Sequence, residues 1–287
     1  MAPNGGDGTA GHGRRAVWPK ALAGEGARSS LIAATSTVVF LVAVGVLVAT
    51  SPNWPKVQQQ FFNPEDFRAS FPDVLGGFWV NLQLFAISMI TIPVVALVVA
   101  VMRSLRGPGF FPIRALAIIY TDILRGIPLI LLILLLGFGL PALDIAGLPR
   151  SAWFWGLTAL TLSYSAYTAE IYRSGIDAVP ESQRASARAL GLTQTQALRY
   201  AILPQAIRNV VPALMNTVVS LQKDVALVSV LGVREAVREA EIYTSRSFNY
   251  TSYVVATLLF LAISIPLTRV VDWYTNRDRE LRSQVAT

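Results

Sequence analysis

Few residues of this chain are of the types that carry out catalysis. The sequence has no cysteine and a single histidine, His12, which lies in a glycine-rich stretch. Cysteine nucleophiles and thiolate metal sites are therefore excluded, and a histidine-based triad or metal site is disfavoured. The sequence also lacks a glycine-rich phosphate loop followed by Lys-Ser or Lys-Thr. We expect no catalytic residue, no metal site and no cofactor bound by this chain.

Two adjacent ionisable residues lie deep in an otherwise apolar stretch. The chain is 53% hydrophobic and only 14% charged, so Lys223 and Asp224 stand out. Counted from Arg208 at about 1.5 Å per residue, Lys223 lies roughly 22 Å along a membrane-spanning helix. Ionisable groups at that depth usually face the bundle interior or a water-filled cavity. The pair would complement a solute that carries an ammonium and a carboxylate; alternatively, it is a salt bridge that holds a break in the helix.

Other polar residues could line the same water-filled cavity, which would be a path for a solute through the membrane. Asn216 precedes Lys223 by about two helical turns, and the unusually polar stretch 151–172 contains Tyr164 and Glu170. Hydroxyl and small residues at this density favour contact between helices, and Glu170 can pair with the arginine three residues later. Helix packing or a local ion pair is thus the alternative to a position on such a path. The candidate path residues are Tyr164, Glu170, Asn216, Lys223 and Asp224.

Composition and charge place the chain in a membrane. Soluble domains carry roughly a quarter charged residues, well above the 14% found here. The formal net charge of +7 is interpreted by the position of the cations relative to the spans, rather than as a nucleic-acid surface. We expect an all-α integral membrane protein that contacts lipid and no nucleic acid.

Six stretches of the sequence are expected to cross roughly 30 Å of hydrocarbon. Residues 1–30 are rich in Gly and Ala and are expected to form a disordered tail. The proline-rich residues 51–75 are expected to form an exposed loop. The first span is interpreted as uncleaved, because the apolar core of a signal peptide is shorter. The expected spans are 31–50, 76–102, 127–140, 151–172, 209–231 and 251–271; the last five form a transmembrane domain over 76–271, and 272–287 form a second tail.

Lysines and arginines are distributed unequally between the two sides of these spans. Fifteen lie in the two tails, the loop 102–115 and the segment 173–208, and six lie in the loops on the other side. The positive-inside rule therefore predicts that both termini and the segment 173–208 are cytoplasmic and that the loop 51–75 is outside.

The segment 173–208 is a polar insertion between two spans. It contains five arginines and no lysine, and two short helix-like pieces meet at Gly191. Gly191 allows a positive φ or the close approach of a partner's backbone, although it could also act only as a helix cap. Ordinary turns between helices need only a few residues, so this hydrophilic hairpin indicates a docking site for a soluble partner.

Four ordered motifs make the chain resemble a known family. SQRASARALG (182–191) and ILPQA (202–206) are similar, at matching spacing, to the EAA loop of permease subunits of ATP-binding-cassette (ABC) importers. RGIPLILL (125–132) and LQKDVALVSVLG (221–232) resemble two further segments of the polar amino-acid branch of that family. The resemblance covers about residues 73–275, so the family core would supply five spans and the segment 31–50 one more.

The resemblance implies that the segment 173–208 is a coupling hairpin for a separate ATPase. Where the family usually has glutamate in this loop, the chain has Ala185. The glutamate contact is then absent or moved to Glu181, and docking would depend on shape through small residues. The docking residues that the resemblance implies are Ala185, Ser186, Ala187, Gly191, Leu203 and Pro204.

The function that the resemblance implies is that of a permease subunit of an ATP-driven importer for amino acids, polar ones in particular, in a bacterial plasma (inner) membrane. Its partners would be a dimer of a cytoplasmic ATPase, which binds ATP and Mg²⁺, a second permease subunit, identical or a sister chain, and an extracytoplasmic solute-binding protein. The residues leave two alternatives open. One is an ion-coupled secondary transporter, which needs no hairpin; the other is a membrane receptor or scaffold that uses the hairpin in signalling.

Overall fold

The computed structural model describes residues 27–105 and 107–285 of the chain, and every regular element in those ranges is helical. The all-α fold expected from the sequence is therefore confirmed. Two units, up to Val57 and from Gln58 onward, are compact by themselves. Most of the expected first tail, residues 1–26, lies outside the described residues.

The first unit contains the helix α1 (Ala27–Ala49) and the start of α2 (Trp54–Phe61). Residues Ile32–Ala49 are long and apolar enough to span a membrane, and their large apolar side chains are exposed. The expected tail is wrong for residues 27–30, which are helical. Ala27 and Arg28 are good helix formers and extend the apolar helix by one turn.

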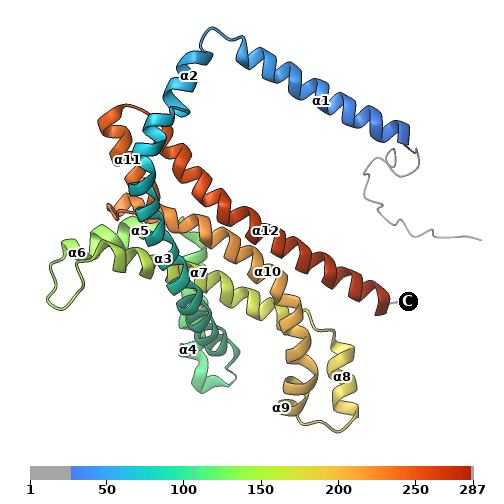
Figure 1. Ribbon diagram of the computed structural model, residues 1–287. Helices are drawn as coiled ribbons and strands as arrows, with labels where there is room; N and C mark the ends of the chain where they lie inside the picture. Colours follow the sequence, from blue (N-terminus) through green and yellow to red (C-terminus); the bar gives the residue numbers. More distant parts are fainter. Residues whose placement is uncertain (1–26, 106, 286–287) are drawn as a thin grey trace, which may run out of the picture. The chain divides into compact units, whose positions relative to one another are not determined.

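The second unit is a bundle of helices (Figure 1). Two π-helical turns (Leu135–Gly139 and Leu198–Ile202) and a 3₁₀ segment (Val225–Leu231) join some of them end to end. Beyond α2, the α-helices are α3 (Pro64–Ser104), α4 (Phe111–Gly126), α5 (Leu129–Leu134), α6 (Leu140–Ala142), α7 (Ala152–Asp177), α8 (Glu181–Ala189), α9 (Gln194–Ala197), α10 (Leu203–Asp224), α11 (Ala236–Ser247) and α12 (Thr251–Val285).

The stretch 51–75, expected to be a loop, is largely helical. It contains α2 and the first turns of α3. The side chain of Asn63 caps α3 by accepting the Glu65 amide at 2.9 Å. Pro55 and Pro64 occupy the first turns of α2 and α3, where no intrahelical donor is lost, whereas Pro72 lies inside α3.

Four helical stretches among the described residues are long and apolar enough to cross a membrane, in α1, α2–α3, α9–α10 with the 3₁₀ segment, and α12. The helices α4 and α5–α6 would together form a fifth span, bent by 108° between Gly126 and Leu129. The helix α7 has 26 residues but is too polar to qualify by composition. Its buried Ser163, Ser165 and Thr168 pack within the bundle, so the expected total of six spans requires both α7 and the bent pair to cross.

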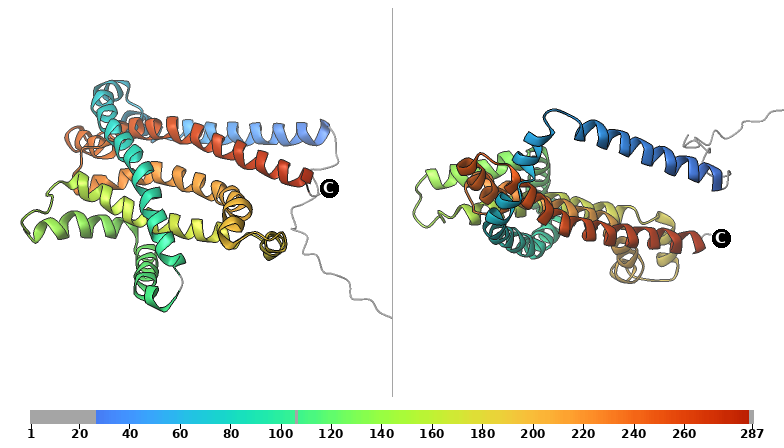
Figure 2. Two further views of the ribbon diagram at one scale, coloured as in Figure 1. Left: turned by 90° about the horizontal axis from the view of Figure 1, so that it is seen from below. Right: turned by 45° about the horizontal axis from the view of Figure 1, so that its top comes forward.

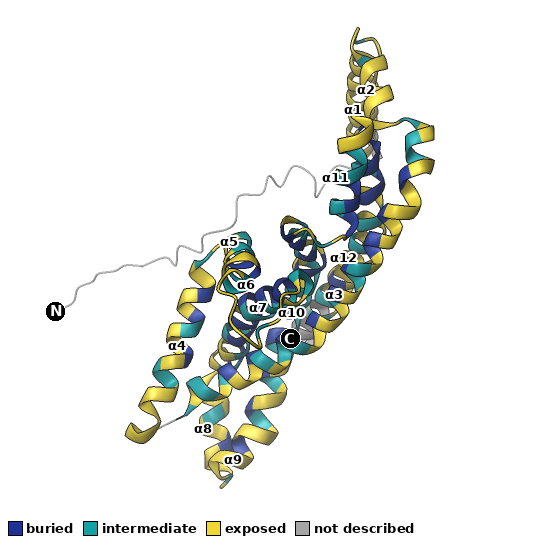
Figure 3. Ribbon diagram, turned by 90° about the vertical axis from the view of Figure 1, so that its left-hand side faces the viewer, coloured by how far each residue is buried: buried dark blue, intermediate teal, exposed yellow. Residues whose placement is uncertain are grey.

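The core lies where α3 crosses its neighbours. Val74 and Phe78 of α3 pack on α11 and α12, and Leu84 further along α3 packs on α7 and the 3₁₀ segment. A Cβ atom on Gly77 would lie 2.6 Å from the backbone carbon of Glu235, so only glycine allows this approach of α3 to the start of α11. The start of α11 and the facing part of α3 are accordingly buried, whereas α8 and α9 are mostly exposed (Figure 3).

Candidate functional site

A cleft of about 730 Å³ lies between the end of α4, the loop to α5, α7 and α10. Its volume is within the range of about 300–1,000 Å³ that is usual for small-molecule sites. It brings together Tyr164, Glu170, Asn216 and Asp224, four of the five candidate path residues. On α10, Asn216, Ser220 and Asp224 are four residues apart and form one face of the helix. The remaining lining residues that bear polar groups are Arg125, Ser163, Tyr167, Ser174 and Thr217.

One end of the cleft is acidic. The hydroxyl of Tyr164 on α7 donates a hydrogen bond of 2.6 Å to a carboxylate oxygen of Asp224 on α10. A carboxylate can accept about four hydrogen bonds, so Asp224 retains acceptor capacity on the side that faces the cleft. It is placed to bind an ammonium group.

The fifth candidate, Lys223, lies elsewhere. Its side chain is exposed and lines a second groove of about 640 Å³ between α10, α11 and α12, together with Tyr253, Ser264 and Asp272. Neighbouring residues of a helix point about 100° apart, which explains why Lys223 and Asp224 face different grooves. Among the described residues, no ion pair joins the two, so the alternative of a Lys223–Asp224 salt bridge is not what the structure shows.

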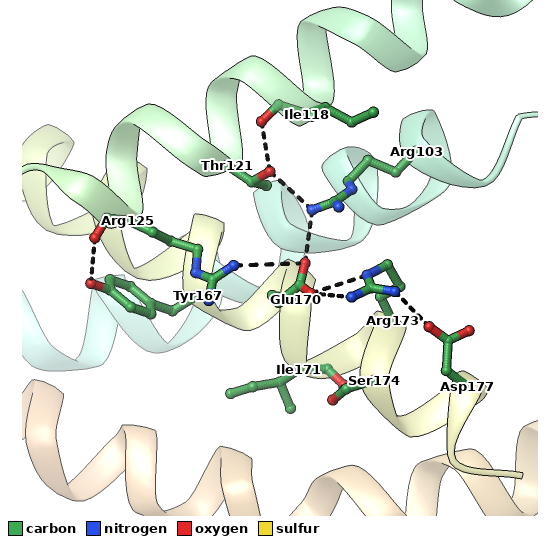
Figure 4. A network of polar contacts seen from close by, with 10 residues as sticks. All are labelled: Arg103, Ile118, Thr121, Arg125, Tyr167, Glu170, Ile171, Arg173, Ser174 and Asp177. Carbon is green, nitrogen blue, oxygen red and sulfur yellow. Dashed lines mark hydrogen bonds and ion pairs between the residues drawn. The ribbon is translucent and has the colours of Figure 1, made fainter.

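Glu170 is the centre of an ionic network at the other end of the cleft (Figure 4). Its carboxylate accepts a 2.8 Å hydrogen bond from Arg103 of α3 and a 3.1 Å bond from Nε of Arg173 on its own helix. Arg103 also donates to Thr121 of α4 at 2.9 Å. The local pair that the sequence predicts between Glu170 and the arginine three residues later is thus confirmed. The network additionally joins α3 and α4 to α7.

Arg125 is a cleft residue that is not among the five candidates predicted from the sequence. Its Nη1 lies 3.9 Å from Glu170, its guanidinium carbon lies 5.8 Å from the centre of the Tyr167 ring, and its side chain is 41% exposed. The Tyr167 hydroxyl donates to the Arg125 carbonyl at 3.0 Å and fixes the end of α4. With Arg103 and Arg173 closer to Glu170, Arg125 is the guanidinium that faces the cleft. The sequence did contain a signal for Arg125, because this residue begins RGIPLILL, one of the four motifs of the family resemblance.

The hairpin of α8 and α9 lies at one end of α7 and α10 (Figure 2). Gly191 adopts φ +76°, in the left-handed region, and ends the first arm. Thr193 then caps α9 by a reciprocal pair of hydrogen bonds with Gln196. Of the residues implied as docking residues, Ala187 is buried and packs inside the hairpin. Those on its surface are Ala185, Ser186, Gly191, Leu203 and Pro204.

The tip of the hairpin presents a large apolar side chain that is not among the docking residues implied by the motifs. Leu190 is 81% exposed and directly precedes Gly191. An apolar side chain with that exposure at a turn, next to small exposed residues, is suited to insertion into a partner's surface. Tyr200, which is 66% exposed, adds a second apolar group after α9.

Comparisons with known proteins agree with this arrangement. Residues 108–279 match the family described as binding-protein-dependent transport system inner membrane component. The chain is 32% identical over 208 residues to the arginine transport system permease protein ArtQ of Bacillus subtilis, covering 71% of this chain and 92% of that protein. It is 33% identical to the Probable glutamine ABC transporter permease protein GlnM of the same organism, covering 72% and 94% of the two chains.

Solved structures show the same fold. A chain of the crystal structure of an amino acid ABC transporter with histidines superposes with a TM-score of 0.66 at 32% identity, covering 72% of this chain and 94% of that one. A chain of the inward-facing MetNI methionine ABC transporter gives a TM-score of 0.58 at 19% identity over 72% and 96% of the two chains, which supports the fold alone. The resemblance found in the four motifs is confirmed: this multi-pass chain belongs to the inner membrane components of binding-protein-dependent transport systems.

Proposed function

We propose that this chain is the translocation subunit of an ATP-driven importer of amino acids and that the cleft between α4, α7 and α10 is part of the substrate path. The cleft carries the proposal, because it places a cation, Arg125, and a carboxylate, Asp224, on the walls of one cavity. An amino acid presents a carboxylate and an ammonium to match them. The names of the relatives, which include arginine and glutamine systems, support this class of substrate. The hydroxyl and amide groups of Ser163, Asn216 and Ser220 would suit a polar side chain.

Uptake of labelled amino acids tests this assignment. Vesicles that contain the chain with its ATPase, a partner permease and the solute-binding protein are supplied with ATP. Asp224→Asn keeps the shape of the side chain but removes the charge, and we expect uptake to fall roughly ten- to hundredfold, as for a lost charge-assisted hydrogen bond. Arg125→Gln should have a similar effect.

The neighbouring residue Lys223 separates two arrangements of the path. If the substrate is held by Arg125 and Asp224, Lys223→Gln should leave uptake unchanged, because Lys223 lines the other groove. If Lys223 and Asp224 bind the substrate as a pair, which is one of the two alternatives that the sequence left open, both substitutions should impair uptake alike. Unimpaired uptake with Asp224→Asn and with Arg125→Gln would contradict the proposed path.

The exposed hairpin supports docking of a cytoplasmic ATPase, which would bind ATP and Mg²⁺ and drive the cycle. The surface offers the side chain of Leu190 and, beside it, Gly191, where a partner's backbone meets no side chain. The excess of arginines and lysines in the tails and hairpin favours a cytoplasmic location for both termini. In the complete importer, the chain would pair with a second permease, identical or a sister chain, and would receive substrate from an extracytoplasmic binding protein.

Leu190→Asp tests the docking surface. Because Leu190 is 81% exposed, the substitution should leave the fold of the chain intact and prevent copurification of the ATPase. Phe248→Asp is a matched control, since Phe248 is 79% exposed in the turn between α11 and α12. Normal copurification with Leu190→Asp would show that the ATPase docks elsewhere.

A further inference from the structure

The first arm of the hairpin is joined to α7 by one arginine. Arg184, on α8, donates from Nη2 to the carbonyl of Ile176 at 2.6 Å and from Nε to the carbonyl of Val179 at 3.5 Å. Ile176 belongs to the last turn of α7 and Val179 to the linker that follows. The last carbonyls of a helix lack intrahelical donors and carry the negative end of its dipole, so a guanidinium is well suited to this position.

Arg184 differs from the other arginine of α8 in the partners it binds. Arg188 is 61% exposed and pairs with Glu181 of the same helix at 2.8 Å. Arg184 also lies 3.7 Å from a Glu181 oxygen, but its side chain is only 28% exposed, and its two hydrogen bonds go to carbonyls outside α8. Arg184 occupies a position that the EAA-loop pattern leaves free, between Gln183 and Ala185.

The second arm of the hairpin is joined to the bundle by packing. Val179 forms a buried apolar cluster with Ile202 and Ala206, at the point where the π-helical turn passes into α10. One turn further, a Cβ atom on Gly175 of α7 would lie 2.0 Å from a methyl group of Val210, so α7 and α10 are in close contact. The base of the hairpin therefore connects to both helices that carry the cleft.

The contact of Arg184 lies close to the cleft along α7. Glu170 and Ser174 line the cleft within two turns of Ile176, the residue that Arg184 holds. A displacement of α8 would reach α7 through the linker 178–180 and through Arg184. The linker is itself constrained, because Val179 is buried and Pro180 has a fixed φ. The two hydrogen bonds of the planar Arg184 guanidinium add a direct connection that fixes the orientation of α8 relative to the end of α7.

We propose that Arg184 is the positioning residue that transmits motion of α8 to α7, so that ATP hydrolysis on a docked ATPase reshapes the cleft. The proposal rests on the proposed docking of an ATPase at the hairpin. Arg184 acts through α7 and does not itself bind the ATPase or the substrate. Its loss uncouples hydrolysis from transport.

Three quantities measured on the complete complex test this role: copurification of the ATPase, the rate of ATP hydrolysis and the uptake of amino acid per ATP hydrolysed. With Arg184→Ala, we expect normal copurification, continued hydrolysis and a fall of about tenfold or more in uptake per ATP, as two charge-assisted hydrogen bonds are lost. Arg184→Lys, which can still donate to the Ile176 carbonyl, should recover part of the uptake. Arg114→Ala, an arginine of α4 that packs on the Phe111 ring 5.8 Å away, is the control and should change none of the three.

The outcomes separate this proposal from the one on which it rests. If the unaltered chain does not copurify with the ATPase, docking at the hairpin is wrong. If docking is normal but Arg184→Ala leaves uptake per ATP unchanged, the transmission role is wrong. Loss of copurification with both Arg184→Ala and Arg184→Lys would also overturn it, because Arg184 would then be a docking contact or a support of the hairpin fold. A purely structural defect would lower uptake and hydrolysis together and leave their ratio constant.

Discussion

Two glutamates of this chain hold helices together in opposite ways. Glu235 is completely buried, and its carboxylate accepts hydrogen bonds from Asn81 of α3 at 2.8 Å and from the Arg238 amide at 2.8 Å. Glu170 lies at the edge of an open cleft and is surrounded by three guanidinium groups. The partners of Glu235 are neutral groups, a short asparagine side chain and a backbone amide. Those of Glu170 are charged arginine side chains, which are long and partly exposed.

The difference indicates which joints of the bundle are fixed. Asn81 binds the start of α11 twice, because its amide oxygen also accepts the Ala236 amide at 3.0 Å. We call this contact between Asn81, Glu235 and Ala236 the fixed junction. Its hydrogen bonds are satisfied in one geometry only, and breaking it would leave buried polar groups without partners. The arginines around Glu170 can exchange partners, for example with Asp177, which Arg173 already contacts at 2.6 Å. A transport cycle needs both rigid contacts and contacts that can change between helices. The contact of Glu170 with its three arginines, which we call the exchangeable junction, is the one beside the cleft.

Gly77→Ala should have the largest effect on stability, because it attacks the fixed junction directly. The added methyl would lie within 2.8 Å of three backbone atoms of Glu235 and Ala236, which cannot rotate away. We expect the free energy of unfolding to fall by about 2 to 3 kcal/mol. Chemical denaturation of the purified protein in detergent measures it.

Gly76→Ala is the matched control for this substitution. No atom lies within 4 Å of the added Cβ, so alanine should stabilise α3 by up to about 1 kcal/mol through its helix propensity. Equal effects of the two substitutions would mean that the approach of α3 to α11 is not a tight constraint.

Asn81→Leu should have the next largest effect. The substitution leaves the Ala236 amide and one oxygen of Glu235 without a side-chain partner, at a cost of about 2 kcal/mol in the free energy of unfolding. The exposed Gln83 of the same helix provides the control, since Gln83→Leu should change stability by less than about 0.5 kcal/mol. A similar small value for Asn81→Leu would show that the bonds to α11 contribute nothing net.

The fixed junction was not predictable from the sequence, but much of the hairpin was. Asn81 and Glu235 are 154 residues apart and belong to no motif, so only the fold brings them together. The two short helices that meet at Gly191 follow from local signals that act within a few residues, namely the glycine and the polar flanks. Four motifs in fixed order were also enough to identify the family.

The cleft shows where local reasoning failed. Lys223 and Asp224 were predicted together as path residues because both lie deep in the membrane-spanning segment. Depth along a helix does not specify which face of the helix a side chain occupies. Arg125 was missed because its partner, Glu170, lies 45 positions later, and because the bend between α4 and α5 that exposes it is a tertiary feature. The loop expected over 51–75 failed for a different reason, since a proline in the first turn of a helix and one in a loop look alike in a sequence.

Glu170→Gln sharpens the comparison at the exchangeable junction. Glutamine keeps the shape of the side chain, and the guanidinium groups remain partly hydrated, so we expect a loss of only about 1 kcal/mol in the free energy of unfolding. High salt should reduce this difference between the two proteins, because it screens partly exposed charges. A salt-independent loss as large as that of Asn81→Leu would place Glu170 among the fixed joints.

The last substitution is Glu235→Gln, whose effect on stability changes with pH. Burial raises the pKa of the Glu235 carboxyl above its usual range, and the hydrogen bonds from Asn81 and the backbone offset this only in part. The folded state then holds its proton more tightly than the unfolded state does, so the contribution to stability is complete below the ordinary glutamate pKa and is lost as pH rises through the raised one.

Glutamine cannot titrate, so Glu235→Gln should remove this decline. Relative to the unaltered protein, the variant should become progressively more stable as the pH rises above the glutamate range. Thermal unfolding midpoints of both proteins over a series of pH values measure the difference. Glu241→Gln is the control, because Glu241 is an exposed residue of the same helix that pairs with Arg238 at 2.8 Å. A constant difference at all pH values would mean that Glu235 keeps one protonation state throughout, and that the fixed junction owes its rigidity to geometry alone.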